Sequence, residues 1–129
     1  MSQPFKKHPD LLPTVFEYLE NLFPTRTFAE DLTGWQAPEV WITIAPSGGT
    51  IRRLRLGSPR LDVNVYAPTK PQAFDIAMDV IQALMEMKNF QGDDFVITNI
   101  ECSYPADISD PLNYNPRWVF DVSLTYRTK

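Results

Sequence analysis

The architecture of this chain is set by the segment RWVFDVSLTYRTK, residues 117–129. From Trp118 to Tyr126, apolar or aromatic side chains alternate with polar ones, apart from Val119. A period of two is typical of a β-strand with one buried face and one exposed face. About ten residues in this pattern would span roughly 33 Å, longer than an average strand of about 5–6 residues. We therefore expect a long strand that lies inside a sheet as a permanent member.

Two upstream segments are predicted to be helices. The first follows Asp10 as its N-cap and carries apolar residues at helical spacing until Pro24 ends it. The second begins with a capping box at residues 69–72, with Pro71 in the first turn, where its missing N–H costs nothing. Between residues 73 and 87 its apolar side chains leave only one polar stripe. A single sheet face cannot cover so much apolar surface, so the other helix or another subunit must contribute.

The remaining segments read as strands and turns. Strands are expected, in chain order, at residues 26–32 (weakly), 40–45, 51–56, 61–67 and 95–102. Ser47-Gly-Gly49 is predicted to be the turn of a hairpin, and residues 103–116 a long loop before the final strand. This order favours an α+β sandwich, a mostly antiparallel or mixed sheet with two helices packed on one face. We expect one domain over residues 1–129, with residues 1–9 as a flexible N-terminal arm.

The composition narrows the class of protein. A chain of 129 residues can form one self-sufficient core, and its single cysteine, Cys102, excludes an internal disulfide. No apolar run approaches the ~20 residues that span a bilayer, and the start MSQPFKKHPD lacks the apolar core of a signal peptide. We therefore expect no membrane partner, and folding in a cytoplasm. The net charge of −4 argues against nucleic acid as the main ligand, because phosphate binding needs clustered Lys and Arg.

No set of residues predicts catalysis or a bound metal. His8 is the only histidine, whereas a zinc site needs three or four ligands and a catalytic base needs a positioned partner. The only histidine that could activate Cys102 is His8, which is remote in the sequence. Cys102 is therefore most simply a small residue at the end of a strand. Ser47-Gly-Gly49 lacks the flanking residues of a phosphate-binding loop. We therefore expect no enzymatic activity, no cofactor and no metal.

Three sets of residues are candidates for contacts with other proteins. One is a cluster of arginines in an otherwise acidic chain: Arg52, Arg53, Arg55 and Arg60. Another consists of the carboxylates on the polar stripe of the second helix: Asp75, Asp79 and Glu86. The third comprises the large apolar side chains of the loop 103–116: Tyr104, Leu112 and Tyr114.

Each set also has a simpler interpretation. The arginines either protect an edge strand from aggregation or contact an acidic partner surface, such as the carboxylate stripe of a neighbouring copy. Evenly spaced carboxylates on an exposed helix face often serve only solvation. The loop is long for a compact domain, and its aromatic residues indicate that it docks on a partner protein when a larger assembly forms. The alternative is a loop folded back on its own subunit through Tyr104.

Two segments resemble one protein family. SPRLDVNVYAPT, residues 58–69, followed by a helix with Ala73, Ala77 and Leu84, is similar to the central segment of tail terminator proteins of long-tailed bacteriophages. These are also called tail completion or tail-to-head joining proteins. NPRWVFDVSLTYR, residues 115–127, resembles the closing strand of that family, and a first helix ending near a proline fits too. The proline-rich start and the aromatic Trp35 and Trp41 depart from the family pattern.

The resemblance implies a structural virion protein. It would form a homohexameric ring that caps the tail tube, stops tube polymerisation and meets the head-completion or connector protein. Such a ring needs a head-to-tail interface with two different patches on each subunit. The acidic balance suits a lumen through which double-stranded DNA passes without sticking. The alternatives are an α+β interaction module or small adaptor unrelated to phage, and a small-molecule-binding or thioesterase-like enzyme with a pocket between sheet and helix.

Overall fold

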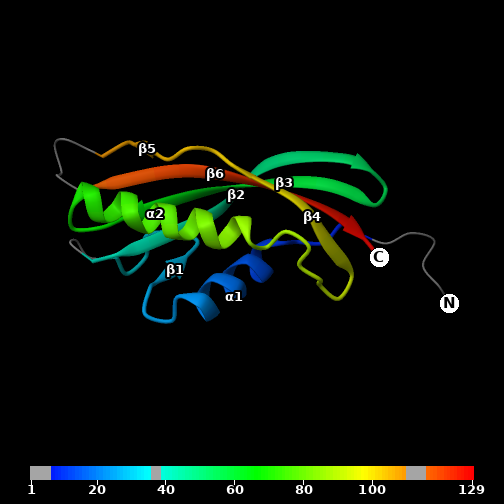
Figure 1. Cartoon of the computed structure of the whole chain (residues 1–129), viewed down its shortest axis with the longest axis horizontal. Coiled ribbons are helices and arrows are strands. Elements are labelled where there is room, and N and C mark those ends of the chain that lie inside the picture. The colour runs from blue at the N-terminus through cyan, green and yellow to red at the C-terminus, as the bar shows by residue number, and fades with distance from the viewer. Residues whose placement is uncertain (1–6, 36–38, 110–115) are drawn as a thin grey trace.

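One mixed sheet organises the protein, as seen in a computed structural model that describes residues 7–35, 39–109 and 116–129. The elements, in chain order, are α1 (Leu12–Leu22), β1 (Phe28–Ala29), β2 (Trp41–Arg53), β3 (Leu56–Tyr66), α2 (Lys70–Met85), β4 (Phe95–Cys102), β5 (Ala106–Asp107) and β6 (Arg117–Thr128). The strands lie in the order β1-β2-β3-β6-β4, and β5 pairs with β6 off this path (Figure 1). Only β1 and β2 run parallel. The described chain is therefore the single α+β domain that the sequence predicts.

β6 is a long strand inside the sheet, as its alternating pattern predicts. It pairs antiparallel with β3 on one side and with β4 on the other. Its inward side chains are buried together with those of the neighbouring strands: Ile42, Ile44, Leu61, Val63, Val65, Ile97, Ile100, Phe120, Val122, Leu124 and Tyr126. The same core cluster includes buried residues of both helices. One face of the sheet thus carries the whole core, and both helices cover it.

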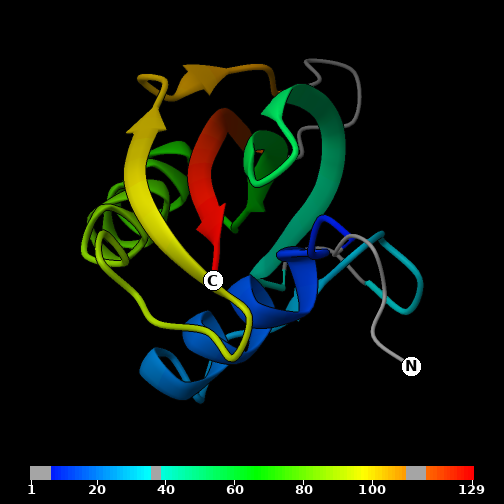
Figure 2. The same cartoon turned by 90° about the vertical axis from the view of Figure 1, so that its right-hand side faces the viewer.

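The two helices begin where local sequence chemistry places them. Thr69 is the N-cap of α2, and its Oγ1 accepts the N–H of Gln72 at 3.2 Å. The N-cap of α1 is Leu11, one residue later than predicted, while Asp10 accepts the N–H of Leu12 at 3.1 Å. Residues of α1 contact α2, so the first helix supplies part of the cover that the apolar second helix needs. Figure 2 shows α1 lying across one side of the strongly curved sheet.

The predicted turn at Ser47-Gly-Gly49 is wrong. β2 continues through these residues to Arg53, and the chain reverses only at Leu54 and Arg55. Gly48 and Gly49 have φ values of 97° and 122°, and the pairing with β3 shifts register between Pro46 and Gly49. The glycines therefore form a bulge that bends a long strand instead of ending it.

The predicted loop 103–116 is also wrong over its first half. Ala106 and Asp107 form β5 and pair with Val119 and Trp118 of β6. The N–H of Ser103 donates to the carbonyl of Asp121 at 2.9 Å. These residues are folded back on their own subunit, as in the alternative weighed for this segment.

The described end of the N-terminal segment lies against the sheet. The ring of His8 is half-buried and forms a hydrogen bond with the hydroxyl of Tyr126. Residues 1–6 of the predicted flexible arm lie outside the described residues.

Candidate protein-interaction surfaces

The end of the β2–β3 hairpin, residues 51–55, is named here the arginine tip. It projects beyond α2 at one end of the molecule (Figure 1). The side chains of Arg52, Arg53 and Arg55 are exposed there, and their predicted contact with another protein stays a prediction. Ile51 and Leu54 are 69% and 80% exposed, which sequence analysis did not anticipate. Exposed apolar side chains rimmed by charged residues are a feature of interaction sites, so the tip is a candidate docking element.

Arg60 does not belong to the arginine tip. Its Nε and one terminal nitrogen donate to the hydroxyl and the carbonyl of Ser47, at 3.2 and 3.3 Å. Ser47 in turn donates its hydroxyl proton to the carbonyl of Arg60 at 3.2 Å. Because Ser47 begins the glycine bulge of β2, Arg60 braces the bend of the hairpin. Arg60 thus has a structural contact within the hairpin, and its predicted role in an interface stays a prediction.

The carboxylate stripe of α2 is exposed but is partly engaged within the chain. Asp79 forms an ion pair with Arg26 at 2.9 Å. Glu86 accepts a hydrogen bond from the side-chain amide of Gln82 at 3.2 Å. Asp75 is exposed near the start of the same helix. Two of the three carboxylates thus have intramolecular partners, which weakens the stripe as an acceptor for arginines of another copy.

Tyr104 lies on the surface beside the first turns of α2. It is 76% exposed, and its ring contacts that of Phe74 at a centroid distance of 6.2 Å. Phe74 packs in turn against Trp118 of β6, at 5.0 Å between centroids. Tyr104 therefore keeps an open face, while Ser103 before it and Ala106 after it are bonded to β6. The other two candidates of this segment, Leu112 and Tyr114, lie outside the described residues.

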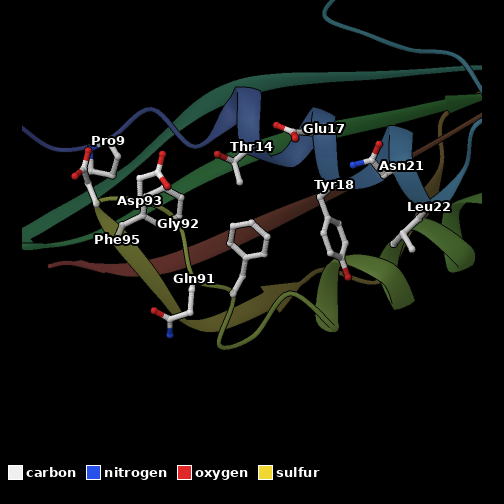
Figure 3. A pocket seen from close by; sticks show the side chains of 12 residues that line it. Pro9, Thr14, Glu17, Tyr18, Asn21, Leu22, Gln91, Gly92, Asp93 and Phe95 are labelled. Atoms are coloured by element: carbon white, nitrogen blue, oxygen red, sulfur yellow. The ribbon is translucent and has the colours of Figure 1, made fainter.

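A groove of about 690 Å³ runs between α1 and the connection from α2 to β4 (Figure 3). It is lined by Pro9, Thr14, Glu17, Tyr18, Asn21, Leu22, Phe90, Gln91, Gly92, Asp93, Asp94 and Phe95. Figure 3 shows Tyr18 extending from α1 toward the opposite wall. The lining combines three aromatic rings with three carboxylates, and none of these twelve described residues is a Lys or Arg.

A carboxylate outside the lining, that of Glu86, adds to the negative charge near the groove. Burial raises the pKa of Tyr18, and the negative charge of nearby Glu86 raises it further. At the rim, the ammonium of Lys129 donates to the carbonyl of Gly92 at 2.9 Å. That cation is anchored to the backbone at one edge and does not stand among the lining residues. We name this surface the acidic groove.

The acidic groove is invisible in the sequence because its two walls are distant in the chain. Residues 9–22 form one wall and residues 90–95 the other. Asp93 and Asp94 directly precede the strand expected at residues 95–102, and Glu17 lies in the first predicted helix. Only the packing of α1 beside the α2–β4 connection brings these carboxylates together.

Cys102, which was considered above as a nucleophile, does not have the properties of a reactive thiol. Burial raises the pKa of the Cys102 thiol to about 11, and the negative charge of Asp121 adds to this effect. Such a thiol is protonated at neutral pH and is a poor nucleophile. Within the described ranges, His, Cys, Asp and Glu side chains form no group of three or more that could hold a metal ion.

Among the residues that the structure describes, no helix has the length and apolar character to cross a membrane. Comparison of the chain with protein-family models and with curated proteins gave no match.

Proposed function

We propose that this protein is a tail terminator of a long-tailed bacteriophage. In this proposal it forms a ring, a homohexamer, on the head-proximal end of the tail. The ring ends polymerisation of the tail tube protein and presents a surface to the head-completion or connector protein. The protein is made in the host cytoplasm and becomes part of the virion.

The observation that supports this proposal is the arrangement of the two segments that carry the resemblance. They are separated by some fifty residues of chain, yet β3 and β6 pair antiparallel from Arg60–Ser123 to Tyr66–Arg117. The first segment ends at Thr69, which caps α2, and Ala73, Ala77 and Leu84 of that helix are buried in the core. The resemblance therefore concerns one contiguous unit, two central strands and the helix that covers them.

The surface of the molecule is compatible with a structural role in a ring. A closed ring needs two different patches on each subunit, and the arginine tip and the acidic groove are two patches of opposite charge. The net charge of −4 is compatible with a lumen that repels phosphate, through which double-stranded DNA passes without specific binding. The proposal includes no catalytic turnover, cofactor or metal.

Electron microscopy and a tube-growth assay test the proposal together. Negative-stain images of the purified protein should show rings with sixfold symmetry. Added to a polymerising tail tube protein, the wild-type protein should bind tube ends and shorten the tubes in proportion to its concentration. Tubes of unchanged length, with no protein at their ends, would exclude the tail terminator function.

The oligomeric state also separates the alternatives. An interaction module or adaptor would remain a monomer or dimer and leave tube growth unchanged. A small-molecule-binding or thioesterase-like enzyme would bind a ligand in the groove and turn over a substrate, which the raised pKa of Cys102 does not favour.

A further inference from the structure

We propose that the arginine tip of one copy docks into the acidic groove of the next copy. This inference rests on the proposed function, because it names the contact that would build the ring. It commits to a second copy of this chain as the occupant of the groove, and charge complementarity is the observation that selects it.

The tip has the composition of a docking element. Three arginines and two large apolar side chains stand within five residues, and Ile51 and Leu54 are 69% and 80% exposed. Neither the Arg26–Asp79 nor the Lys70–Asp107 ion pair involves the tip. The turn at Leu54 and Arg55 is held at its base, because the carbonyl of Arg55 accepts the N–H of Thr128 at 2.9 Å. A rigid, protruding tip loses little conformational freedom on binding, which favours association.

The groove offers the matching groups. Glu17, Asp93 and Asp94 supply carboxylates, which guanidinium groups bind through paired, charge-assisted hydrogen bonds. Tyr18, Phe90 and Phe95 supply apolar surface for Ile51 or Leu54, and aromatic faces for an arginine. The volume of about 690 Å³ is within the ~300–1,000 Å³ typical of sites that enclose drug-sized ligands, so several side chains can enter.

The two surfaces are different parts of the molecule, which determines the type of assembly. The tip is formed by β2 and β3, and the groove by α1 and the α2–β4 connection. A contact between unlike patches can be made head to tail, so that each copy keeps a free tip and a free groove, and a ring forms if the rotation closes. Two copies that exchanged the contact reciprocally would form a twofold dimer instead, so the proposal requires rings and not dimers in the images.

The carboxylate stripe of α2 is the competing acceptor. Asp79 is already paired with Arg26 and Glu86 accepts from Gln82, which leaves Asp75 as the carboxylate without such an engagement in the described structure. The stripe also borders a smaller hollow of about 360 Å³, but its two carboxylates there, Asp79 and Glu86, are the two that are already engaged. The groove combines charge with concavity and aromatic surface, so it is the better fit.

Charge reversal tests the contact in the full chain. A tip-reversed variant carries R52E, R53E and R55E, and a groove-reversed variant carries E17K, D93K and D94K. Sedimentation velocity at rising protein concentration should show that each variant alone associates on the order of 100-fold more weakly than wild type, because like charges then face each other. Circular dichroism should show unchanged folding, since these side chains are exposed. D75K, on the stripe and outside the groove, is the control and should assemble normally.

Mixing the two variants provides the decisive result. A glutamate tip fits a lysine groove, and an arginine tip fits a carboxylate groove, so each variant complements only the other. The equimolar mixture should regain assembly, and native mass spectrometry should find oligomers with equal numbers of both variants. A chain carrying all six substitutions should also assemble by itself.

Every other outcome has a definite meaning. Normal assembly of either variant alone, or a mixture that stays apart, overturns the tip–groove contact. If D75K is the variant that fails, the stripe is the acceptor. Normal assembly of the groove-reversed variant leaves the groove to a different ligand. Rings that obey the charge rules but do not stop tube growth leave the contact standing and refute the tail terminator function. A wild-type chain that stays monomeric at every concentration, and on tube ends, overturns both.

Discussion

Replacing Gly57 by alanine should destabilise the protein, although the backbone at this position does not require glycine. The φ of Gly57 lies outside the left-handed region, and the residue sits in β3 directly opposite Tyr126 of β6. A Cβ added there would lie 2.7 Å from Oη and 2.8 Å from Cζ of Tyr126. The tyrosine is only 2% exposed and its hydroxyl is bonded to His8, so the ring cannot move away freely. Overpacking of this kind costs about 1–3 kcal/mol, and we expect about 2 kcal/mol of lost unfolding free energy.

The same substitution should become neutral or stabilising once the phenol ring is removed. In a Tyr126→Leu background the atoms that clash are absent. Alanine is then favoured over glycine within a strand by roughly 0.5–1 kcal/mol, because it loses less backbone entropy. Urea unfolding of wild type, G57A, Y126L and the double variant gives the coupling energy, expected near 2–3 kcal/mol. A G57A protein as stable as wild type, or an equal cost in both backgrounds, would refute this reasoning.

Three further predictions follow from the described contacts. Leu124→Ala removes about three buried carbons at ~0.8 kcal/mol each and leaves a cavity, so urea unfolding should show a loss of about 3 kcal/mol of unfolding free energy. The control is Ser123→Ala on the outward face, which should cost under ~0.5 kcal/mol. Equal losses would contradict the assigned faces. Hydrogen bonds from Ser109, with Lys70 nearby, lower the pKa of Asp107 from 3.8 to about 2, so its stabilisation of the fold is present above pH 3.8 and is lost as the pH falls toward about 2. Acid titration of D107N should lack this component, and a profile identical to wild type would count against it. The Cys102 thiol, with its pKa raised from 9.0 to about 11, should hold on the order of 100-fold less thiolate and alkylate correspondingly slowly at neutral pH; the rate expected of a free thiol would disprove this.

The parts of the fold that the sequence predicts are those encoded by local chemistry. The alternation from Trp118 to Tyr126 specifies a half-buried strand, and the Thr69 side chain specifies where α2 begins. The glycine pair at residues 48 and 49 could not be interpreted locally, because a turn and a bulge need the same positive φ. Pairing with β3 decides between a turn and a bulge, because Ser58 and Pro59 continue the pairing of the two strands past the glycines. The same holds for β5, which exists only because β6 offers its edge.

The candidate surfaces likewise have some features that the sequence predicts and others that depend on the folded structure. The exposure of the arginines could be predicted, because charge in a hairpin is a local property. The exposure of their neighbours Ile51 and Leu54 could not be predicted, because apolar residues in a strand normally face a core. Arg60 was grouped with them by proximity in sequence, but its contacts with Ser47 are made across two strands. The acidic groove needs the packing of distant segments before its charges form one surface.

The place of β6 between β3 and β4 has a consequence for how the protein is made. β3 and β4 are not neighbours in the sheet, and β6, which pairs with both, follows both in the chain. A nascent chain that has left the ribosome only as far as β4 therefore holds two unpaired strand edges and an uncovered apolar helix. The cooperative step of folding has to wait for residues 117–128, and pairing over such sequence separations is slow. Chaperones would meet this intermediate during synthesis, and the supply of folded protein would be limited by the release of each complete chain.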